Sequence, residues 1–274
     1  MNLGEINELT ILRFTSVGAY LGDEEDNDVL LPNKYLTPEM ELDEKVNVFL
    51  YKDSEDRIVA TTETPLLKLN EFALLRVKDV NPIGAFLDWG LEKDLLVPFR
   101  EQKVKMEVGR SYLVTLRYDD ATDRLFASGK IQRYLDACED ESILNSEVEI
   151  IVGDTSELGV SVIVNNRYSG IIYRNDVNRP LRKGERLQAF VYNIREDGKL
   201  DLRLERADIQ RFDEAAERIH ELLKDQHKLY LSDKSDPDLI RESVQMSKKM
   251  FKQAVGKLYK AKLIKINEDS IELI

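Results

Sequence analysis

Apolar and polar residues alternate in short stretches through residues 1–206, and the alternation recurs in three units. Each unit opens with an apolar stretch that contains a glycine, and these glycines are Gly18, Gly84 and Gly159. A second apolar stretch, a longer one and a final one led by a basic residue follow in the same order. Because a period of two is typical of strands, the pattern predicts about five short strands in each unit.

The three units keep equal spacing between their landmarks. Gly18 and Gly84 are 66 residues apart, and so are Pro32 and Pro98. Gly84 and Gly159 are 75 residues apart, and the basic residues that lead the last strands of the second and third units keep the same offset. Equal spacing of several landmarks indicates an internal repeat in which each unit folds as one small module.

A short sheet with no helix to cover it hides its edge strands by closing on itself. We therefore predict that each unit is a five-stranded Greek-key barrel of the OB type, with boundaries at 1–64, 71–135 and 146–206. The repeated glycine fits a bend or bulge at which a Cβ atom would obstruct the barrel. The connectors are brief and not rich in Gly or Ser, so we expect restricted motion between the modules.

The periodicity changes in the last part of the chain, where apolar residues recur at the helical period of about 3.6. Asp208 is expected to cap a first helix, Asp236 and Pro237 to begin a second, and Ser247 to cap a third. Two short strands at the end of the sequence form a hairpin. This order predicts a winged helix-turn-helix over 207–274. The predicted fold class is therefore mainly β with a C-terminal α+β module.

The formal net charge of -12 argues, for the chain as a whole, against binding to nucleic acid, because phosphate contacts need a positive surface. The distribution of charge changes this interpretation. Residues 1–71 carry a net charge of -10 and residues 72–145 a net charge of -2, whereas 146–206 and 207–274 are balanced. The later modules can therefore present local basic faces.

The third predicted helix is the most basic element. Seven lysines and no acidic residue lie between Met246 and Lys265. At about 100° per residue, Lys249, Lys252 and Lys260 fall opposite the apolar stripe, with Gly256 among them. A glycine within a helix costs about 1 kcal/mol relative to alanine, so it indicates close approach of a phosphate or a backbone. A solvated lysine face with an incidental glycine is the alternative, and both stay open.

The second unit resembles the S1 RNA-binding domain, a subclass of the OB fold. The resemblance rests on the strands 83–87 and 96–99, and on Asp120 with Arg124 four residues later. It implies that aromatic side chains stack on bases and that basic ones hold phosphates. Two residues depart from the family pattern, since Ile83 replaces the first aromatic residue and Pro98 stands where a histidine is expected.

The other two units match the S1 pattern at fewer positions. In the third unit, Tyr173 takes the histidine position and Lys199 the basic position, while a serine replaces the aromatic residue. In the first unit, Tyr20 and Arg57 match, but the acidic loop 23–26 would repel a phosphate. Whether the first module binds RNA therefore stays open.

The order of three S1-type modules and a winged helix that contains 251–260 is similar to the bacterial conserved virulence factor B family. The resemblance covers essentially the whole chain. It implies an RNA-binding protein that influences gene expression and has no catalytic residues. The residues predicted to bind single-stranded RNA are Phe86, Phe99, Arg124, Lys130, Tyr173, Lys199, Lys248, Lys249, Lys252 and Lys260.

Several of these side chains have structural alternatives. Phe86 alternates with two apolar neighbours and is predicted to face outward, although a core position is the other possibility. Trp89 is expected to pack under a loop rather than to contact a base. Arg124 could instead form a surface ion pair with Asp120 or Asp123, of the weak kind that is common on protein surfaces.

The sequence offers little support for other functions. The single cysteine and two histidines form no metal-ligand pattern, and no phosphate-binding loop is present. We therefore predict a non-catalytic protein without a cofactor, and a metal nuclease site assembled across modules is the enzymatic alternative. No apolar run reaches the ~18 residues of a membrane span, and no signal peptide is evident, so we expect a cytoplasmic location.

Two non-enzymatic alternatives remain. One is an adaptor that contacts the ribosome or RNA polymerase through the acidic first module. The other is a DNA-binding regulator that uses the winged helix, although operator specificity usually needs a dimer and no dimerisation heptads are evident.

Overall fold

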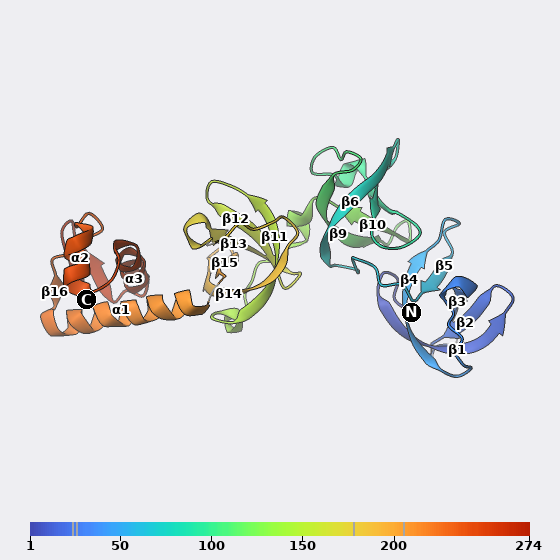
Figure 1. Ribbon diagram of the computed structural model, residues 1–274, viewed down its shortest axis with the longest axis horizontal. Coiled ribbons are helices and arrows are strands. Elements are labelled where there is room, and N and C mark those ends of the chain that lie inside the picture. Colours follow the sequence, from blue (N-terminus) through green and yellow to red (C-terminus); the bar gives the residue numbers. More distant parts are fainter. Residues whose placement is uncertain (24, 26, 178, 205) are drawn as a thin grey trace.

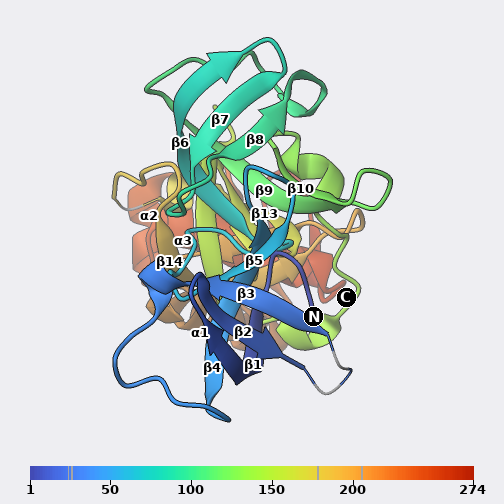
Figure 2. The ribbon, with the colours of Figure 1, turned by 90° about the vertical axis from the view of Figure 1, so that its right-hand side faces the viewer.

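Four modules follow one another along the chain. The computed structural model describes residues 1–274 except 24, 26, 178 and 205, and it describes 206–213 by their backbone alone. Figure 1 shows the modules in a row, with the N-terminal barrel at one end and the helical module at the other. Figure 2 looks along this row and shows the middle barrel offset from the first. The molecule is therefore elongated, and successive modules lie next to each other along it.

The first and third modules are closed barrels in which the third strand pairs with the fifth, and the fifth with the fourth. Parallel pairing closes the ring, at Leu30 and Val59 in the first barrel and at Gly170 and Leu200 in the third. This order is that of an OB fold and confirms the predicted fold class. The strands are β1 (Ile6–Thr15), β2 (Gly18–Gly22), β3 (Asp28–Pro32), β4 (Lys45–Lys52) and β5 (Ile58–Thr61), then β11 (Glu147–Thr155), β12 (Gly159–Val164), β13 (Tyr168–Tyr173), β14 (Arg186–Ile194) and β15 (Leu200–Arg203).

The middle module has the same strand order, but its sheet is open between β8 and β10. The closing ladder in the other barrels joins only one or two residue pairs, so a small separation of the strands removes it. Leu96 and Leu125, one from each edge strand, instead line a cavity of about 280 Å³. The strands are β6 (Phe72–Asn81), β7 (Gly84–Asp88), β8 (Leu95–Pro98), β9 (Ser111–Asp119) and β10 (Arg124–Ser128).

The repeated glycines lie where two strands approach too closely for a side chain. A Cβ atom on Gly18, Gly84 or Gly159 would come within 2.1, 2.3 and 2.2 Å of a carbonyl oxygen of the next strand. The bulge lies elsewhere, because the register shifts in the strand before each glycine, for example between Ile11 and Arg13. Close backbone approach is therefore the reason for the repeat of glycine.

Residues 206–274 form the helical module. Asp236 accepts a hydrogen bond from a backbone N–H and caps the second helix, and Ser247 caps the third in the same way, as predicted. The first helix begins at Arg206, so Asp208 lies inside it rather than at its cap. No described helix is long and apolar enough to cross a membrane. The elements are α1 (Arg206–Gln226), β16 (Lys228–Leu229), α2 (Pro237–Val244), α3 (Lys248–Lys260), β17 (Ile264–Ile266) and β18 (Ile271–Leu273).

The apolar faces of α1 and α3 pack against each other and form the core of this module. Ile219 and Leu223 of α1 are fully buried, as are Phe251 and Ala254 of α3. The sheet has the order β16-β18-β17, so the C-terminal hairpin lies beside the helices as the wing. The helical period also predicts Ile209 and Phe212 on the apolar face of α1, and their side chains lie outside the described part of the structure.

Candidate nucleic-acid interface

The predicted binding face of the middle barrel lies against the first barrel. Ala85 and Leu87 are fully buried while Phe86 between them is half-buried, so Phe86 faces away from the barrel core. Phe86 and Arg124 line the cavity at the open seam together with Asp56 of the first barrel. The predicted aromatic and basic side chains therefore lie on one face, but an acidic side chain of another module shares it.

The turn between β4 and β5, residues 53–57, is here called the acidic turn. Arg124 donates a hydrogen bond to the carboxylate of Asp56 in this turn. Lys93 donates to the carbonyl oxygen of Asp53 at 2.6 Å. The ion pair that the sequence suggested for Arg124, with Asp120 or Asp123, is replaced by one with a residue 68 positions earlier in the chain. Arg124, which was predicted to contact a phosphate, is therefore already paired with a carboxylate.

Trp89 packs at the contact between the first and middle barrels. Its indole ring is 3% exposed and meets Phe49 and Tyr51 of β4 edge to face, at centroid distances of 5.7 and 6.4 Å. Its Nε1 donates to the carbonyl oxygen of Lys93 at 2.5 Å. The ring thus packs between two modules and is not accessible to a base.

Two further predicted residues of the middle barrel lie outside this cavity. Phe99 belongs to a short 3-10 helix, η2 (Phe99–Glu101), and its ring is 45% exposed. Lys130 donates a hydrogen bond to the carbonyl oxygen of Arg100. Of the two, Phe99 presents more surface to a ligand.

In the third barrel, Tyr173 stands at the position that Pro98 holds in the middle barrel. Tyr173 pairs with Gly159, and Pro98 of the middle barrel pairs with Gly84 in the same way. Of these two residues, Tyr173 alone offers an aromatic ring at this point of the barrel. Its hydroxyl accepts a hydrogen bond from Arg195 at 2.7 Å, and Arg195 also donates to the buried carboxylate of Asp201 at 2.6 Å. This network fixes the orientation of the ring.

A second aromatic face lies nearby on β14. The guanidinium of Arg203 lies 4.0 Å from the ring centroid of Tyr192, and it forms an ion pair with Asp176 at 3.6 Å. Burial raises the pKa of the hydroxyl of both Tyr173 and Tyr192. Both rings therefore stay neutral at physiological pH and do not repel a phosphate.

The sequence did not single out Arg195, Arg203 or Tyr192. The sequence pattern gives little indication that these residues belong to a site. The alternation along β14 and β15 shows only that Tyr192 and Arg203 point to the opposite side of their strands from Val191 and Leu202. Lys199, which the S1 resemblance proposed, lies in the turn before β15 and pairs with Asp197 at 2.5 Å. In this barrel the lysine at the basic position of the S1 pattern is therefore paired with an acidic residue of its own turn.

The lysines of α3 have different environments. Lys248 donates to the carbonyl oxygen of Ser235 within the module, and Lys252 pairs with Asp233 at 3.6 Å. Lys249 donates to the carbonyl oxygen of Asn175 in the third barrel at 2.6 Å. Lys260 has no hydrogen-bond or ion-pair partner among the described residues. Only some of the predicted basic face is therefore available.

A cavity of about 580 Å³ lies between the third barrel and α3, and we call it the α3 cleft. It brings Tyr173 and Lys260, two of the predicted residues, to opposite walls. Gly256 also lines it, and a Cβ atom there would meet no atom within 4 Å. The cleft is lined by Asn145, Tyr173, Asn175, Asp176, Tyr192, Asn193, Arg203, Gln253, Gly256, Lys257, Lys260 and Ala261.

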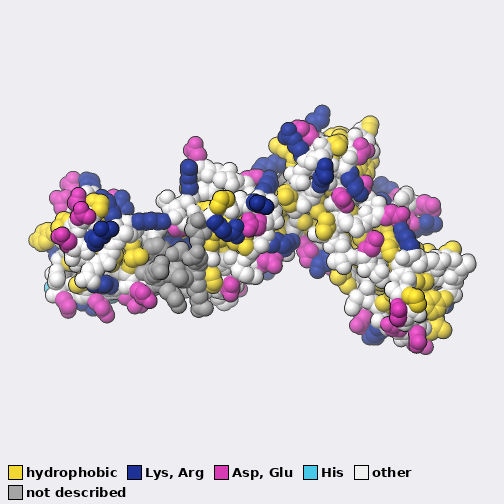
Figure 3. Space-filling model, in the orientation of Figure 1, with side chains coloured by type: hydrophobic (Ala, Val, Ile, Leu, Met, Phe, Trp, Pro, Cys, Tyr) yellow, Lys and Arg dark blue, Asp and Glu magenta, His cyan; other side chains and the backbone are white. Residues whose placement is uncertain are grey.

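The side chains of the α3 cleft suit a nucleotide chain. Tyrosine rings offer stacking surfaces, lysines offer charge to phosphates, and asparagine amides both donate and accept hydrogen bonds. The side-chain oxygen of Gln253 is buried without a hydrogen-bond partner among the described residues. Figure 3 shows Lys and Arg side chains on the visible face from the helical module across to the middle barrel. No group of His, Cys, Asp or Glu in the described residues could hold a metal ion.

Comparisons with known proteins agree with this architecture. Residues 3–63 match the family model of the S1 domain, and residues 217–273 match that of the CvfB-like winged helix domain. The S1 match thus falls on the first barrel, although the sequence pattern was clearest in the second. These two classes of domain define a multidomain protein of the nucleic-acid-binding type.

The chain is similar over most of its length to curated bacterial proteins. It is 31% identical to the uncharacterized protein YitL of Bacillus subtilis, over 95% of this chain and 90% of that protein. It is 28% identical to conserved virulence factor B of Staphylococcus aureus strain N315, over 86% and 81% of the two chains. The chain belongs to the conserved virulence factor B family, which confirms the family resemblance.

A solved structure of a multidomain protein with nucleic acid binding domains from Streptococcus pneumoniae is also similar. It is 24% identical, with a TM-score of 0.42, and the match covers 99% of this chain and 98% of that chain.

Proposed function

We propose that the protein binds single-stranded RNA in the α3 cleft, without catalysis, and acts in the regulation of gene expression. The observation that carries the proposal is that tyrosine rings of the third barrel and lysines of α3 line one cavity of about 580 Å³. A base that stacks on an aromatic ring gains about 1–3 kcal/mol, and cations beside it hold the backbone.

The shape of the cleft favours an unpaired strand. Bases of a duplex are stacked inside the helix, whereas those of a single strand can turn into a cavity and stack on a side chain. The asparagines of the cleft can form hydrogen bonds with a ribose 2′-hydroxyl, which is the group that distinguishes RNA from DNA. These features support RNA as the ligand.

The position of α3 argues against the DNA-regulator alternative. A recognition helix reads DNA by inserting its exposed face into the major groove. Here Gly256 and Lys260 of that face line the α3 cleft, and Lys249 is bound to the backbone of the third barrel. We therefore favour RNA over duplex DNA. The adaptor alternative depends on the acidic first barrel and predicts complexes that survive nuclease treatment.

Titration with homopolymeric single-stranded RNAs tests the proposal. Tyr173→Ala should weaken binding roughly fivefold to 150-fold, which corresponds to about 1–3 kcal/mol. Tyr230→Ala is the matched control, because this tyrosine of the helical module is 76% exposed and lies outside the cleft. Equal effects of the two substitutions, or stronger binding to duplex DNA than to RNA, would refute the proposal.

A further inference from the structure

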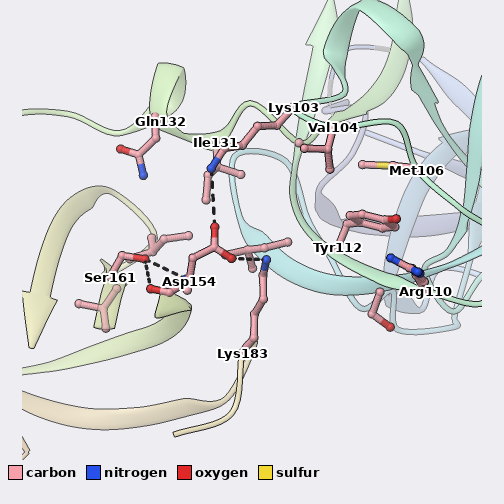
Figure 4. A pocket seen from close by; sticks show the side chains of 16 residues that line it. Lys103, Val104, Met106, Arg110, Tyr112, Ile131, Gln132, Asp154, Ser161 and Lys183 are labelled. Carbon is pink, nitrogen blue, oxygen red and sulfur yellow. Dashed lines mark hydrogen bonds and ion pairs between the residues drawn. The ribbon is translucent and has the colours of Figure 1, made fainter. Parts of the chain in front are cut away.

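A second cavity, of about 350 Å³, lies between the middle and third barrels, and we call it the junction cavity. Figure 4 shows Tyr112 and Met106 of the middle barrel on one side and Asp154 and Lys183 of the third barrel on the other. It shares no residue with the α3 cleft. The cavity is therefore a separate candidate site, at a boundary of the kind where ligand pockets are common.

The walls of the junction cavity are fixed to each other. An apolar cluster joins the two barrels through Phe72 and Leu113 from one and Ile151 and Ile163 from the other. Arg186 of the third barrel also donates to the carbonyl oxygen of Phe72 at 2.7 Å. The cavity is thus part of a packed interface rather than a gap between independent domains.

One wall of the junction cavity carries positive charge. Lys103 of the middle barrel and Lys183 of the third barrel approach the carboxylate of Asp154, at 3.6 and 2.5 Å (Figure 4). The hydrogen bond from Lys183 lowers the pKa of Asp154, so the carboxylate stays ionised. Two ammonium groups around one carboxylate leave a net positive charge, which favours an anion at this wall.

The opposite wall carries the side chain of Met106, the ring of Tyr112 and the guanidinium of Arg110, which pairs with Glu107 at 3.0 Å (Figure 4). Met106 is 3% exposed, and Tyr112 is half-buried with its hydroxyl oxygen accepting from the backbone N–H of Glu107 at 3.1 Å. The exposed amide of Gln132 lies across the cavity from Tyr112, on the side of Ser161 (Figure 4), where it can donate and accept hydrogen bonds. Together these side chains suit a flat group with polar edges.

We propose that the junction cavity binds one phosphorylated nucleoside, with its phosphate at Lys103 and Lys183 and its base against Tyr112 and Met106. The volume is near the lower end of the roughly 300–1,000 Å³ of small-molecule sites, so it admits a single nucleotide. The nucleotide is either free or one unit of a bound RNA strand, and only the second source rests on the proposed function.

Binding of nucleoside 5′-monophosphates and of the matching nucleosides to the full chain tests the site. The double substitution of Lys103→Gln and Lys183→Gln should weaken monophosphate binding roughly tenfold or more, since charge-assisted contacts to the phosphate are lost. Lys105→Gln is the matched control, because Lys105 is exposed in the same segment but does not line the cavity. Nucleosides without phosphate should bind more weakly and respond to neither substitution.

Asp154→Asn gives a test in the opposite direction. Removal of the carboxylate frees both ammonium groups for the ligand, so monophosphate binding should become severalfold tighter. A site in which Asp154 has only a structural role would instead bind equally or more weakly, and this result would contradict the proposal.

These binding experiments distinguish a free nucleotide from a nucleotide that is one unit of an RNA strand. Monophosphate binding that depends on the lysine pair supports a free nucleotide as the ligand. If monophosphates do not bind but the lysine pair is needed for RNA binding, the nucleotide enters as part of the strand. If neither ligand responds to the pair while Tyr173→Ala still weakens RNA binding, the junction cavity is not a site and the proposed function stands.

Discussion

Two barrel surfaces near opposite ends of the molecule are used in opposite ways. At the junction of the first and middle barrels, Arg124 and Lys93 are bound by the acidic turn, and Trp89 is buried between the modules. At the junction of the third barrel and α3, Tyr173 and Lys260 instead line an open cleft. The module that packs against a barrel therefore decides whether its face holds the protein together or remains available to a ligand.

This comparison also explains how a chain of net charge -12 suits an anionic ligand. Much of the negative charge belongs to the first barrel, and part of it neutralises Arg124 and Lys93 of the middle barrel through Asp56 of the acidic turn. The third barrel and α3, which line the α3 cleft, lie toward the other end of the molecule (Figure 1), in segments where acids and bases balance. Exposed charges farther apart than about 10 Å are screened at 0.1 M salt, so the local charge matters more than the total.

Trp89→Ala should give the largest change and should affect stability rather than binding. Removal of a buried aromatic side chain costs about 3–5 kcal/mol, and here it opens the packing on Phe49 and Tyr51. Chemical denaturation should show this loss of unfolding free energy in the first two modules, while the RNA affinity of the folded protein stays unchanged. A loss of affinity without a loss of stability would make the first junction a binding site.

Lys260→Gln should weaken RNA binding by about 1 kcal/mol, or roughly fivefold, because one phosphate contact is lost. Lys265→Gln is its control, since Lys265 is exposed on β17 outside the cleft. The salt dependence should also become shallower for Lys260→Gln, by about 0.7 in the slope of log affinity against log salt concentration. An unchanged slope would mean that Lys260 contacts no phosphate.

Gly256→Ala should change the stability of the protein and its RNA affinity in opposite directions. A Cβ atom at this position meets nothing within 4 Å, and alanine is favoured over glycine in a helix, so the free energy of unfolding should rise by about 0.5–1 kcal/mol. The same methyl group narrows the α3 cleft, so RNA affinity should fall a few-fold. Thermal unfolding and titration of one variant check both effects, and a rise in stability without a fall in affinity would make the glycine incidental.

Asp56→Asn should have the smallest effect. The ion pair with Arg124 is exposed, and such pairs contribute about 0–1 kcal/mol, so stability should change little. If Arg124 then reaches a phosphate, RNA affinity should rise by no more than a few-fold. A larger gain would indicate that the acidic turn suppresses a strong site on the middle barrel, and the contrast between the two junctions would have to be revised.

The sequence was sufficient to predict the repeat and the winged helix, because both depend on local patterns. Alternating strands, the spacing of Gly18, Gly84 and Gly159, and the caps Asp236 and Ser247 all act within a module. Tyr173, which the S1 resemblance singled out, is the last residue of β13.

Contacts between modules were beyond the reach of these patterns. The pairing of Arg124 with Asp56 joins residues 68 positions apart, and neither periodicity nor spacing records it. For the same reason the sequence did not bring Tyr192 and Arg203 together with α3. The open seam of the middle barrel depends on a ladder of one or two pairs in its neighbours, which is too short to leave a signal in the sequence.

Photo-crosslinking of 4-thiouridine-labelled single-stranded RNA, with the attachment sites mapped by mass spectrometry, tests where the ligand lies. We expect crosslinks on the tyrosines of the third barrel and on α3, and their loss when unlabelled RNA competes. Crosslinks concentrated instead on Phe86 and Phe99 of the middle barrel would contradict it.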